Sequence, residues 1–408
     1  METPSRELIS ETLRQDLHDL YRVLHQTPEL SMQESETALL IERRMQALGY
    51  DTFRCGDTGV VAVLRNSAGP VVAFRADIDG LPVAEETGLP YQSSARGTLP
   101  DGTDVPVMHA CGHDMHVACA IGAASLLMSL RSRWAGTVVF LFQPGEETAQ
   151  GALNMVTNGL WENTPIPEVI YSQHVWTGPA GQIELTEGPA MAMADGWKVV
   201  VIGRGGHAAR PEDTIDPVLL AAHMVVRIQS VVSREMPAQA SGVVTVATLH
   251  AGHKDNIIPS SAEFTINFRS GDEATRTLLF QALRRVIFAE AAASNALEPL
   301  IEEVYRFPLL FNDPIATREA RIALCAAFGS DNVQVGALKM ASEDFGILAD
   351  SAGVPGVYWF FGGTAEDTSQ RDGPTPVNHS PFYAPVMEPT LTTGVTAAFT
   401  AIMSRVAV

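Results

Sequence analysis

Apolar residues recur at spacings of three and four along the N-terminal segment of the chain. The positions are Ile9, Leu13, Leu17, Leu20, Tyr21 and Leu24. This spacing places them on one face of a helix, because an α-helix turns once in about 3.6 residues. The segment therefore predicts an amphipathic helix, which we expect to pack against a sheet.

Short apolar runs follow this helix, and their length is typical of buried strands. The runs span residues 60–64, 71–74, 138–142 and 169–171. A longer apolar stretch, residues 117–130, lies among them and favours a helix. Strands that alternate with helices predict an α/β fold, in which helices form a layer against a sheet.

The pattern changes after Trp197. Strands are predicted at 198–202, 243–249, 262–268 and 300–305, and helices at about 216–232 and 273–291. This order, βαββαβ, is that of a ferredoxin-like unit. The α/β character then returns, with an apolar run at 357–361 and a final helix at about 391–406. We expect residues 1–191 and 307–408 to form one mixed-sheet α/β domain, with residues 192–306 inserted as a ferredoxin-like domain.

Composition narrows the classes of function. The 408 residues are 46% hydrophobic, which indicates a folded protein large enough for two domains. The net charge is −20, from 27 Lys and Arg against 47 Asp and Glu, so binding to nucleic acid or to an anionic membrane surface is disfavoured. The longest apolar stretch has 14 residues, fewer than the roughly 20 of a membrane span. The N-terminus lacks the apolar core of a secretion signal, and four cysteines do not make a disulfide scaffold, so a cytoplasmic protein is expected.

Polar clusters follow three of the predicted strands at the point where each strand ends. They are residues 75–79, 143–147 and 172–174. Ligands of open α/β sheets bind outside the carboxyl ends of the strands. Segments that are distant in the sequence are therefore expected to meet in one cleft.

A dense His and Cys cluster, residues 109–116, precedes the helix at 117–130. Cys111 and His113, two residues apart at a loop-to-helix junction, can both point at one metal ion. A lone cysteine is more often a small buried hydrophobe, which is how we interpret Cys55, Cys119 and Cys325. The density of the cluster favours the metal-ligand interpretation for Cys111 and His113.

Two adjacent glutamates, Glu146 and Glu147, follow the predicted strand at 138–142. An unselected Glu-Glu pair is more often a solvated turn. In metal-assisted hydrolysis, both carboxylates can have a role. One can hold a metal ion while the other takes a proton from water and passes it to the leaving nitrogen.

Nine motifs, in this order, make the chain resemble the M20 metallopeptidases, and within them the amidohydrolase branch of aminoacylases, hippurate hydrolases and auxin-conjugate hydrolases. They are LHQTPELSMQE (24–34), FRADIDGLP (74–82), MHACGHDMH (108–116), FQPGEE (142–147), SQHVW (172–176), GRGGHAARP (203–211), DNIIPSSAEFTINFR (255–269), SEDF (342–345) and NHSPF (378–382). The resemblance implies a catalytic α/β domain and an inserted domain that serves as a lid and in dimerisation.

The resemblance also implies two divalent metal ions per subunit, Zn²⁺, Mn²⁺ or Co²⁺. Cys111 is expected to bridge the two ions. His113 and His174 are expected to complete the protein ligands of one ion. Glu147 and His379 are expected to complete those of the other.

Catalytic roles follow from the same resemblance. Glu146 is the expected general base, and Asp77 is expected to orient a ligand. Further supporting or structural roles are expected for Asp79, His109, Asp114 and His116. The remaining histidines are interpreted as ordinary surface or core residues: His18, His25, His223, His250 and His253.

The inserted domain contributes three expected site residues. His207 is expected to polarise the scissile carbonyl, either in its own chain or across the interface of a homodimer or dimer of dimers. Arg269 and Asn256 are expected to hold the α-carboxylate of a small N-acyl amino acid, because a guanidinium fork fits a carboxylate. By residue type alone, His207 could be a surface residue and Arg269 an ordinary salt-bridge partner.

Several functions remain open at this point. The favoured one is cleavage of the amide bond of N-acyl amino acids by metal-activated water, with Glu146 as base. A dipeptidase, or another small-amide hydrolase of the same family, is the nearest alternative. A non-catalytic metal-binding relative is a second. In a third, Cys111 acts as a thiol nucleophile with His113 or His109 as its base.

Overall fold

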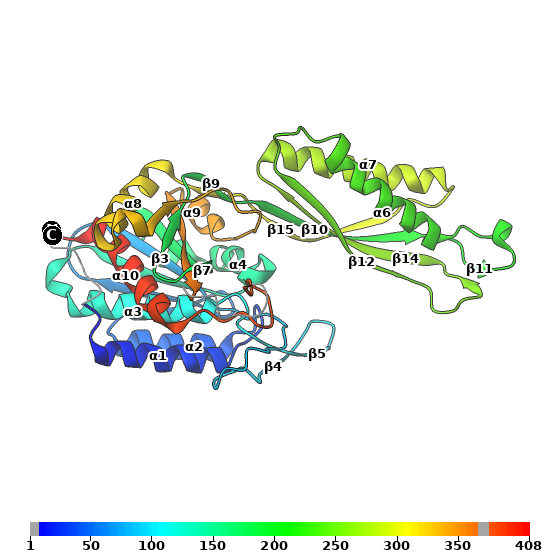
Figure 1. The fold of residues 1–408 in the computed structure, drawn as a ribbon. Helices are drawn as coiled ribbons and strands as arrows, with labels where there is room; N and C mark the ends of the chain where they lie inside the picture. The colour runs from blue at the N-terminus through cyan, green and yellow to red at the C-terminus, as the bar shows by residue number, and fades with distance from the viewer. Residues whose placement is uncertain (1–7, 366–374) are drawn as a thin grey trace. The chain divides into compact units, whose positions relative to one another are not determined.

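The structure is a computed structural model that describes residues 8–365 and 375–408 (Figure 1). The chain forms two compact units. The first takes in the chain up to Ala190, Phe311–Ala337 and the chain from Asp344 onwards. The second consists of Met191–Leu310 and Leu338–Glu343. The second unit thus contains a short segment, Leu338–Glu343, that lies beyond the predicted insertion of residues 192–306.

The first unit is built on a mixed sheet. Within the described residues the strand order is β1-β2-β6-β3-β7-β18-β8-β17. The strands are β1 (Asp51–Cys55), β2 (Gly59–Arg65), β3 (Val71–Asp77), β6 (Thr137–Gln143), β7 (Val169–Pro179), β8 (Ile183–Leu185), β17 (Val333–Val335) and β18 (Gly356–Thr364). Strands β6, β3, β7 and β18 run parallel, whereas β2 and β8 are antiparallel to their neighbours β6 and β18.

Helices pack on this sheet. The longer ones are α1 (Glu11–Gln26), α2 (Ser35–Ala47), α3 (His113–Ser129), α8 (Pro314–Phe328) and α10 (Met387–Val406). Helix α3 contacts both α1 and α10, and Figure 1 shows α1 and α3 lying side by side along the sheet. Their apolar side chains share one buried cluster with the strands, including Tyr21, Phe74, Phe140 and Trp359.

The shorter elements of the first unit complete it. Helices α4 (Gly151–Thr157) and α9 (Gly346–Ala352) contact each other, and α9 also contacts β7 and β18. Helix α5 (Leu160–Asn163) follows α4. Strands β4 (Arg96–Thr98) and β5 (Asp104–Pro106) form an antiparallel hairpin. Two further short strands, β9 (Gly188–Met191) and β16 (Leu310–Asn312), lie at the points where the chain passes between the units.

The second unit is an antiparallel sheet with two helices. In the described chain its strand order is β12-β14-β10-β15. In chain order its main elements are β10 (Met193–Ile202), α6 (Pro217–Arg234), β12 (Gly242–Ala251), β14 (Ser261–Ser270), α7 (Glu273–Ala293) and β15 (Leu300–Phe307). Helices α6 and α7 lie side by side on the sheet (Figure 1) and bury a separate core that includes Trp197 and Phe264. A short ladder pairs β11 (Gly206–His207) with β13 (Ile257–Ile258).

Three strands are longer than the apolar runs that predicted them. β3 continues through Asp77, β6 through Gln143 and β7 through His174 to Pro179. A strand predicted from a run of apolar residues ends at the first polar residue. Here Asp77, Gln143 and His174 are themselves buried, so their polar side chains lie on the strands and not in loops after them.

No helix among the described residues has both the length and the apolar character needed to cross a membrane. The most uniformly apolar helix next to the site, α3, has 17 residues. Roughly 20 are needed for a span. The predicted helix at 117–130 lies within α3, which is buried on nearly every side.

Candidate metal centre

The candidate site lies at the carboxyl ends of three neighbouring parallel strands. β3 pairs in parallel with β6 on one side and with β7 on the other. Parallel strands end at the same edge of a sheet, so β3, β6 and β7 deliver their polar residues to one place. This is the convergence that the sequence predicted.

The start of α3 places Cys111 and His113. Gly112, which precedes the helix, has a φ of 85°, and a Cβ there would lie 2.4 Å from Cγ1 of Val175. Glycine is therefore required at this tight turn. The turn leaves Cys111 just before the helix and His113 as its first residue, and Cys111 Sγ lies 3.4 Å from Nε2 of His174.

His113 has one ring nitrogen held by a carboxylate. Its Nδ1 donates to Oδ1 of Asp79 over 2.9 Å. Its Nε2 lies 3.7 Å from Oδ2 of Asp77 and 3.9 Å from Oε1 of Glu147. His113 Nε2 and Glu147 Oε1 are both buried and have no hydrogen-bond partner among the described residues. Two buried acceptors that face each other fit a cation between them.

The electrostatics at His113 favour a positive charge. Burial alone would lower the pKa of His113, but Asp77, Asp79 and Glu147 outweigh it and raise that pKa to about 10. Three carboxylates around one imidazole make this position attractive to a proton or to a metal ion.

His174 is arranged to offer a lone pair. Its Nδ1 donates to the carbonyl of Val175 over 2.6 Å, so Nε2, which faces Cys111, carries no proton. Burial, with His116 and His113 nearby, holds the pKa of His174 well below its usual range. A neutral imidazole in a fixed tautomer is the form that binds a metal ion.

Glu147 and His379 lie together on the other side of Cys111. Oε1 of Glu147 is 3.3 Å from Nε2 of His379, and the ligand atoms of Cys111, Glu147 and His379 all lie within 4.8 Å of one another. His379 has a φ of 71°, which is uncommon for a residue other than glycine. Backbone strain of this kind concentrates at functional sites.

The structure thus brings all five sequence-predicted ligands together. Cys111 contacts His174, His113 approaches Glu147, and Glu147 approaches His379. Thiolate, imidazole and carboxylate donors in one cluster suit Zn²⁺, Mn²⁺ or Co²⁺. Glu146 lies in the same cluster, with a carboxylate oxygen within 4.8 Å of the ligand atoms of His113 and Glu147.

Asp77 and His116 also lie here, but hydrogen bonds already occupy them. Nδ1 of His116 donates to Asp77, and Nε2 of His116 accepts from the amide of Val175 over 2.8 Å. Asp77 also accepts from Arg75 over 2.6 Å. Asp77 therefore orients His116, whose ring packs edge-on against His174 at 4.5 Å.

Two acidic residues hold the turn that carries the glutamates. Oδ2 of Asp79 accepts from the amide of Glu147 over 3.0 Å and from the hydroxyl of Ser31 over 2.7 Å. Glu34 accepts from the amide of Gly145 over 2.8 Å. Burial and the neighbouring Asp79 raise the pKa of Glu34 to about 7. Sequence reasoning gave Glu34 no role, although it ends the first motif, residues 24–34.

Arg75 is a second residue that sequence reasoning missed. It is fully buried and donates to Asp77, to Gln143 over 2.9 Å and to Asp344 over 3.3 Å. Asp344 in turn accepts from Gln143 over 2.7 Å and from the amide of Ala152 over 3.1 Å. The only signal in the sequence was the place of these residues inside the FRADIDGLP, FQPGEE and SEDF motifs.

His25, interpreted from the sequence as an ordinary residue, is buried between two carboxylates. Its ring lies 2.6 Å from Asp114 and 3.1 Å from Glu85. Burial alone would lower the pKa of His25, but Asp114 and Glu85 raise it to about 10. His25 therefore ties α1 to the start of α3 through a buried ion pair.

The three site residues expected in the inserted domain all lie in the second unit. His207 is exposed on β11, and its Nδ1 accepts from the amide of Ala209 over 3.0 Å. The carbonyl of Asn256 accepts from the amide of Ala208 over 3.1 Å, so Asn256 neighbours His207. Arg269, on β14, donates to the carbonyl of Met340 over 2.7 Å and to Asn267 over 3.3 Å.

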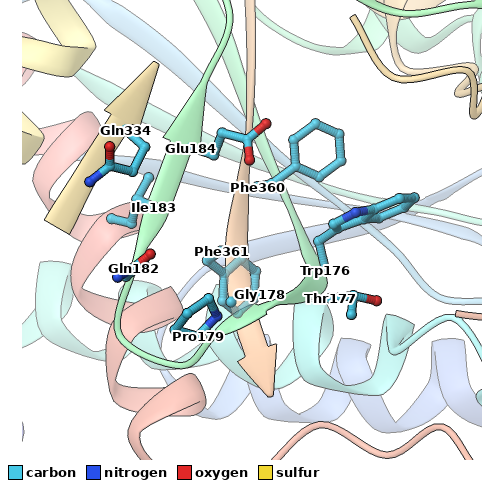
Figure 2. A pocket seen from close by; sticks show the side chains of 11 residues that line it. Trp176, Thr177, Gly178, Pro179, Gln182, Ile183, Glu184, Gln334, Phe360 and Phe361 are labelled. Carbon is cyan, nitrogen blue, oxygen red and sulfur yellow. The ribbon is translucent and has the colours of Figure 1, made fainter. Parts of the chain in front are cut away.

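A pocket in the first unit is lined in part by Trp176, Glu184 and Phe360 (Figure 2). Phe360 stands opposite His174 on the neighbouring strand and opposite Glu184 on the next. The rings of Trp176 and Phe360 lie 5.3 Å apart, and Trp176 lies 5.9 Å from the ring of His174. Figure 2 shows Phe360 beside Glu184, with Trp176 on the other side of Phe360. An aromatic wall therefore adjoins one of the predicted ligands.

Comparison with known proteins decides the family. The model of peptidase family M20/M25/M40 matches residues 73–401. The chain belongs to this family. The M20 chain is 36% identical over 356 residues to an N-acetylcysteine deacetylase from Bacillus subtilis (strain 168). The alignment covers 86% of the chain and 89% of that protein. The chain is also 34% identical over 341 residues to a hippurate hydrolase from Campylobacter jejuni. That alignment covers 83% of the chain and 86% of the hydrolase.

The chain is also similar to a solved structure of the family. The M20 chain superposes on a dinuclear metal binding peptidase of the M20 family from Bacillus subtilis with a TM-score of 0.73 and 29% identity, over 97% of the chain and 99% of that structure. The predicted membership of the M20 family and the prediction of a metal-dependent amidohydrolase are confirmed. The large mixed sheet agrees with that structure.

Proposed function

We propose that the M20 chain hydrolyses the amide bond of N-acyl amino acids with two divalent metal ions. The observation that carries the proposal is that two buried atoms, His113 Nε2 and Glu147 Oε1, lack a hydrogen-bond partner in the described part of the chain. They lie in a cluster with Cys111, His174 and His379. The similarity to an N-acetylcysteine deacetylase and a hippurate hydrolase supports the substrate class.

The five ligands divide between two ions in this proposal. Cys111 would serve both ions, His113 and His174 would hold one, and Glu147 and His379, which lie in one group with Cys111, would hold the other. When bound, the ions activate a water molecule and polarise the scissile carbonyl. Asp79 keeps His113 and Glu147 in place, because its two oxygens accept from one atom of each.

Glu146 is the proposed general base. It is buried, and its carboxylate adjoins His113 and Glu147. A carboxylate that does not hold a metal ion can accept the proton of the attacking water and hand it to the departing nitrogen. The same residue then serves both halves of the reaction.

The second unit supplies the remaining groups in the proposal. Its βαββαβ element order is typical of a ferredoxin-like domain, which we propose acts as a lid and in homodimerisation. His207 stabilises the oxyanion, and Arg269 with Asn256 holds the substrate carboxylate. In the first unit, we place the acyl group against Trp176 and Phe360. The four cysteines form no disulfide, which supports a reducing, cytoplasmic location.

A thiol mechanism at Cys111 fits the site less well. Burial and the carboxylates of Glu147 and Glu146 raise the pKa of the Cys111 thiol well above its usual range. Reactive thiols instead lie in electropositive surroundings that lower the pKa. Cys111 is therefore better suited to bind metal than to attack substrate as a free thiolate.

Metal removal and reloading test the proposed function. The protein is stripped with EDTA, reloaded with Mn²⁺, Co²⁺ or Zn²⁺, and assayed on N-acetyl, N-benzoyl and indole-acetyl amino acids and on dipeptides. We expect hydrolysis of N-acyl amino acids to disappear on stripping and to return on reloading. Preference for dipeptides would select the alternative substrate class. Activity that survives stripping but not thiol alkylation would select the Cys111 nucleophile.

A further inference from the structure

Asn378 begins the NHSPF motif (378–382), in which sequence reasoning assigned a role only to His379, and its side chain lies against Cys111. The turn that contains Asn378 closes with a hydrogen bond of 3.0 Å from the amide of Ser380 to the carbonyl of Val377. Nδ2 of Asn378 lies 3.2 Å from the carbonyl oxygen of Cys111, 3.3 Å from that of Val175 and 3.8 Å from Sγ of Cys111. Three acceptors around one atom identify it as the NH₂ end of the amide.

The position of Asn378 also sets that of the ligand beside it. The amide of His379 donates to the carbonyl of Ala110 over 2.8 Å, so the turn is fastened to the main chain on both sides of Cys111. The bond from Asn378 to Val175 adds the strand that carries His174. One side-chain amide therefore links the segments of three predicted ligands: Cys111, His174 and His379.

The sulfur of Cys111 has few groups that stabilise negative charge. His174 approaches it with Nε2, but the ring proton of His174 is used at Nδ1 by Val175. The carboxylate of Glu147, by contrast, has an oxygen within 4.8 Å of Sγ and repels a negative charge there. Nδ2 of Asn378, whose two hydrogens also serve the carbonyl oxygens of Cys111 and Val175, is an N–H donor 3.8 Å from Sγ. An N–H donor stabilises a thiolate and weakens its donation of charge to a metal ion.

We propose that Asn378 is a positioning residue that fixes the Cys111 thiolate between the metal ions and sets its strength as a donor. The inference rests on the proposed function, in which Cys111 bridges the two ions. It adds a residue that acts through Cys111, which its side chain contacts at both the carbonyl oxygen and Sγ. Removing the amide frees Sγ to turn and raises the energy of its lone pairs.

The cobalt-loaded protein reports on this sulfur directly. A thiolate bound to Co²⁺ gives a charge-transfer absorption band, and the loss of an N–H group at the sulfur moves that band to longer wavelength because the lone pairs lie higher in energy. Cys111→Asp assigns the band, since it removes the sulfur. Cobalt affinity is measured by competition with a chelator, because changes next to metal ligands typically cost roughly 10- to 100-fold in affinity.

The test variants are Asn378→Ala and Asn378→Asp. The second keeps the size of the side chain but removes its N–H donor. Asn312→Ala is the matched control. Asn312 also donates to two main-chain carbonyls, those of Thr186 over 2.9 Å and Tyr358 over 2.7 Å, and it contacts no predicted ligand. Circular dichroism establishes that each variant is folded before its spectrum is compared.

We expect the band to shift to longer wavelength in both Asn378 variants and to stay in place in Asn312→Ala. We also expect cobalt affinity to fall in the Asn378 variants alone. An unshifted band in folded, cobalt-saturated Asn378 variants would overturn the role of Asn378 and leave the proposed metal centre standing. A wild-type protein that binds cobalt without a thiolate band would overturn both, because Cys111 would then not be a ligand.

Discussion

Asp79 and His113 are joined by a hydrogen bond of 2.9 Å between Oδ1 and Nδ1, and the second oxygen of the same carboxylate accepts from the amide of Glu147 over 3.0 Å. One buried side chain thus orients two predicted ligands that lie 34 positions apart in the sequence. The bond at Nδ1 also determines which nitrogen of His113 faces the metal centre.

Asp79→Asn is expected to weaken metal binding. An amide offers one acceptor where the carboxylate offers two, so either His113 or Glu147 loses its support. We expect affinity for Zn²⁺ or Co²⁺ to fall roughly 10- to 100-fold, measured by competition with a chelator. Asp101→Asn is the control, because Asp101 is exposed and accepts from the amide of Thr103, and it should bind metal like the wild type. Equal affinities in the two variants would contradict the role of Asp79.

Cys111→Ala is expected to lose metal from at least one position, because a bridging thiolate belongs to both coordination shells. Cys119→Ala is a close control, since Cys119 is also buried and lies on the same helix as His113. Its Sγ contacts the carbonyl of Leu391 and not the site. Metal content per chain, measured by elemental analysis, should fall in the first variant alone. The same stoichiometry in both would remove Cys111 from the ligands.

The elements that the sequence predicted well are those with a clear apolar period. The amphipathic spacing predicted α1, and the second unit contains strands and helices close to the predicted ranges, such as α7 at Glu273–Ala293. The short elements at the sheet edge, β8 and β17, were not predicted. Each has three residues, too few to show a period, and each is defined by pairing with distant strands.

The residues that hold the ligands were harder to find than the ligands themselves. Cys111 and His113 stand out because their side chains have unusual chemistry and lie close in sequence. Glu34 and Arg75 are common residue types, and their roles depend on partners 111 and 269 positions away. Only the folded chain brings these partners together, so a single sequence reveals them no further than as members of a motif.

His25 is expected to make stability depend on pH. The folded-state pKa of His25 is raised from 6.5 to about 10, so the stabilisation is complete below about pH 6.5 and is lost as the pH rises towards 10. In His25→Gln we expect a lower melting temperature, because Asp114 and Glu85 lose their buried partner, and a flatter pH dependence across this window. A parallel pH profile for variant and wild type would refute this account.

His207→Ala is expected to keep both metal ions and to lose kcat by roughly 10² to 10³, as other oxyanion donors do. His207 belongs to the second unit, whereas all five predicted metal ligands belong to the first. If His207 acts across a dimer, mixed dimers of His207→Ala and Glu146→Gln should recover activity, since one site then holds an intact metal centre and an intact histidine. Absence of recovery, with subunit exchange verified, would place His207 in its own chain's site or outside the mechanism.

The turnover of Glu146→Gln tests the central claim most directly. Glutamine has nearly the same shape as glutamate but cannot accept a proton, so the metal ligands around it should stay in place. On N-acyl amino acids, with the metal-loaded variant and its ion content verified, we predict two ions per chain and a kcat reduced by roughly 10² to 10⁴. A kcat equal to that of the wild type in the fully loaded variant would contradict the account.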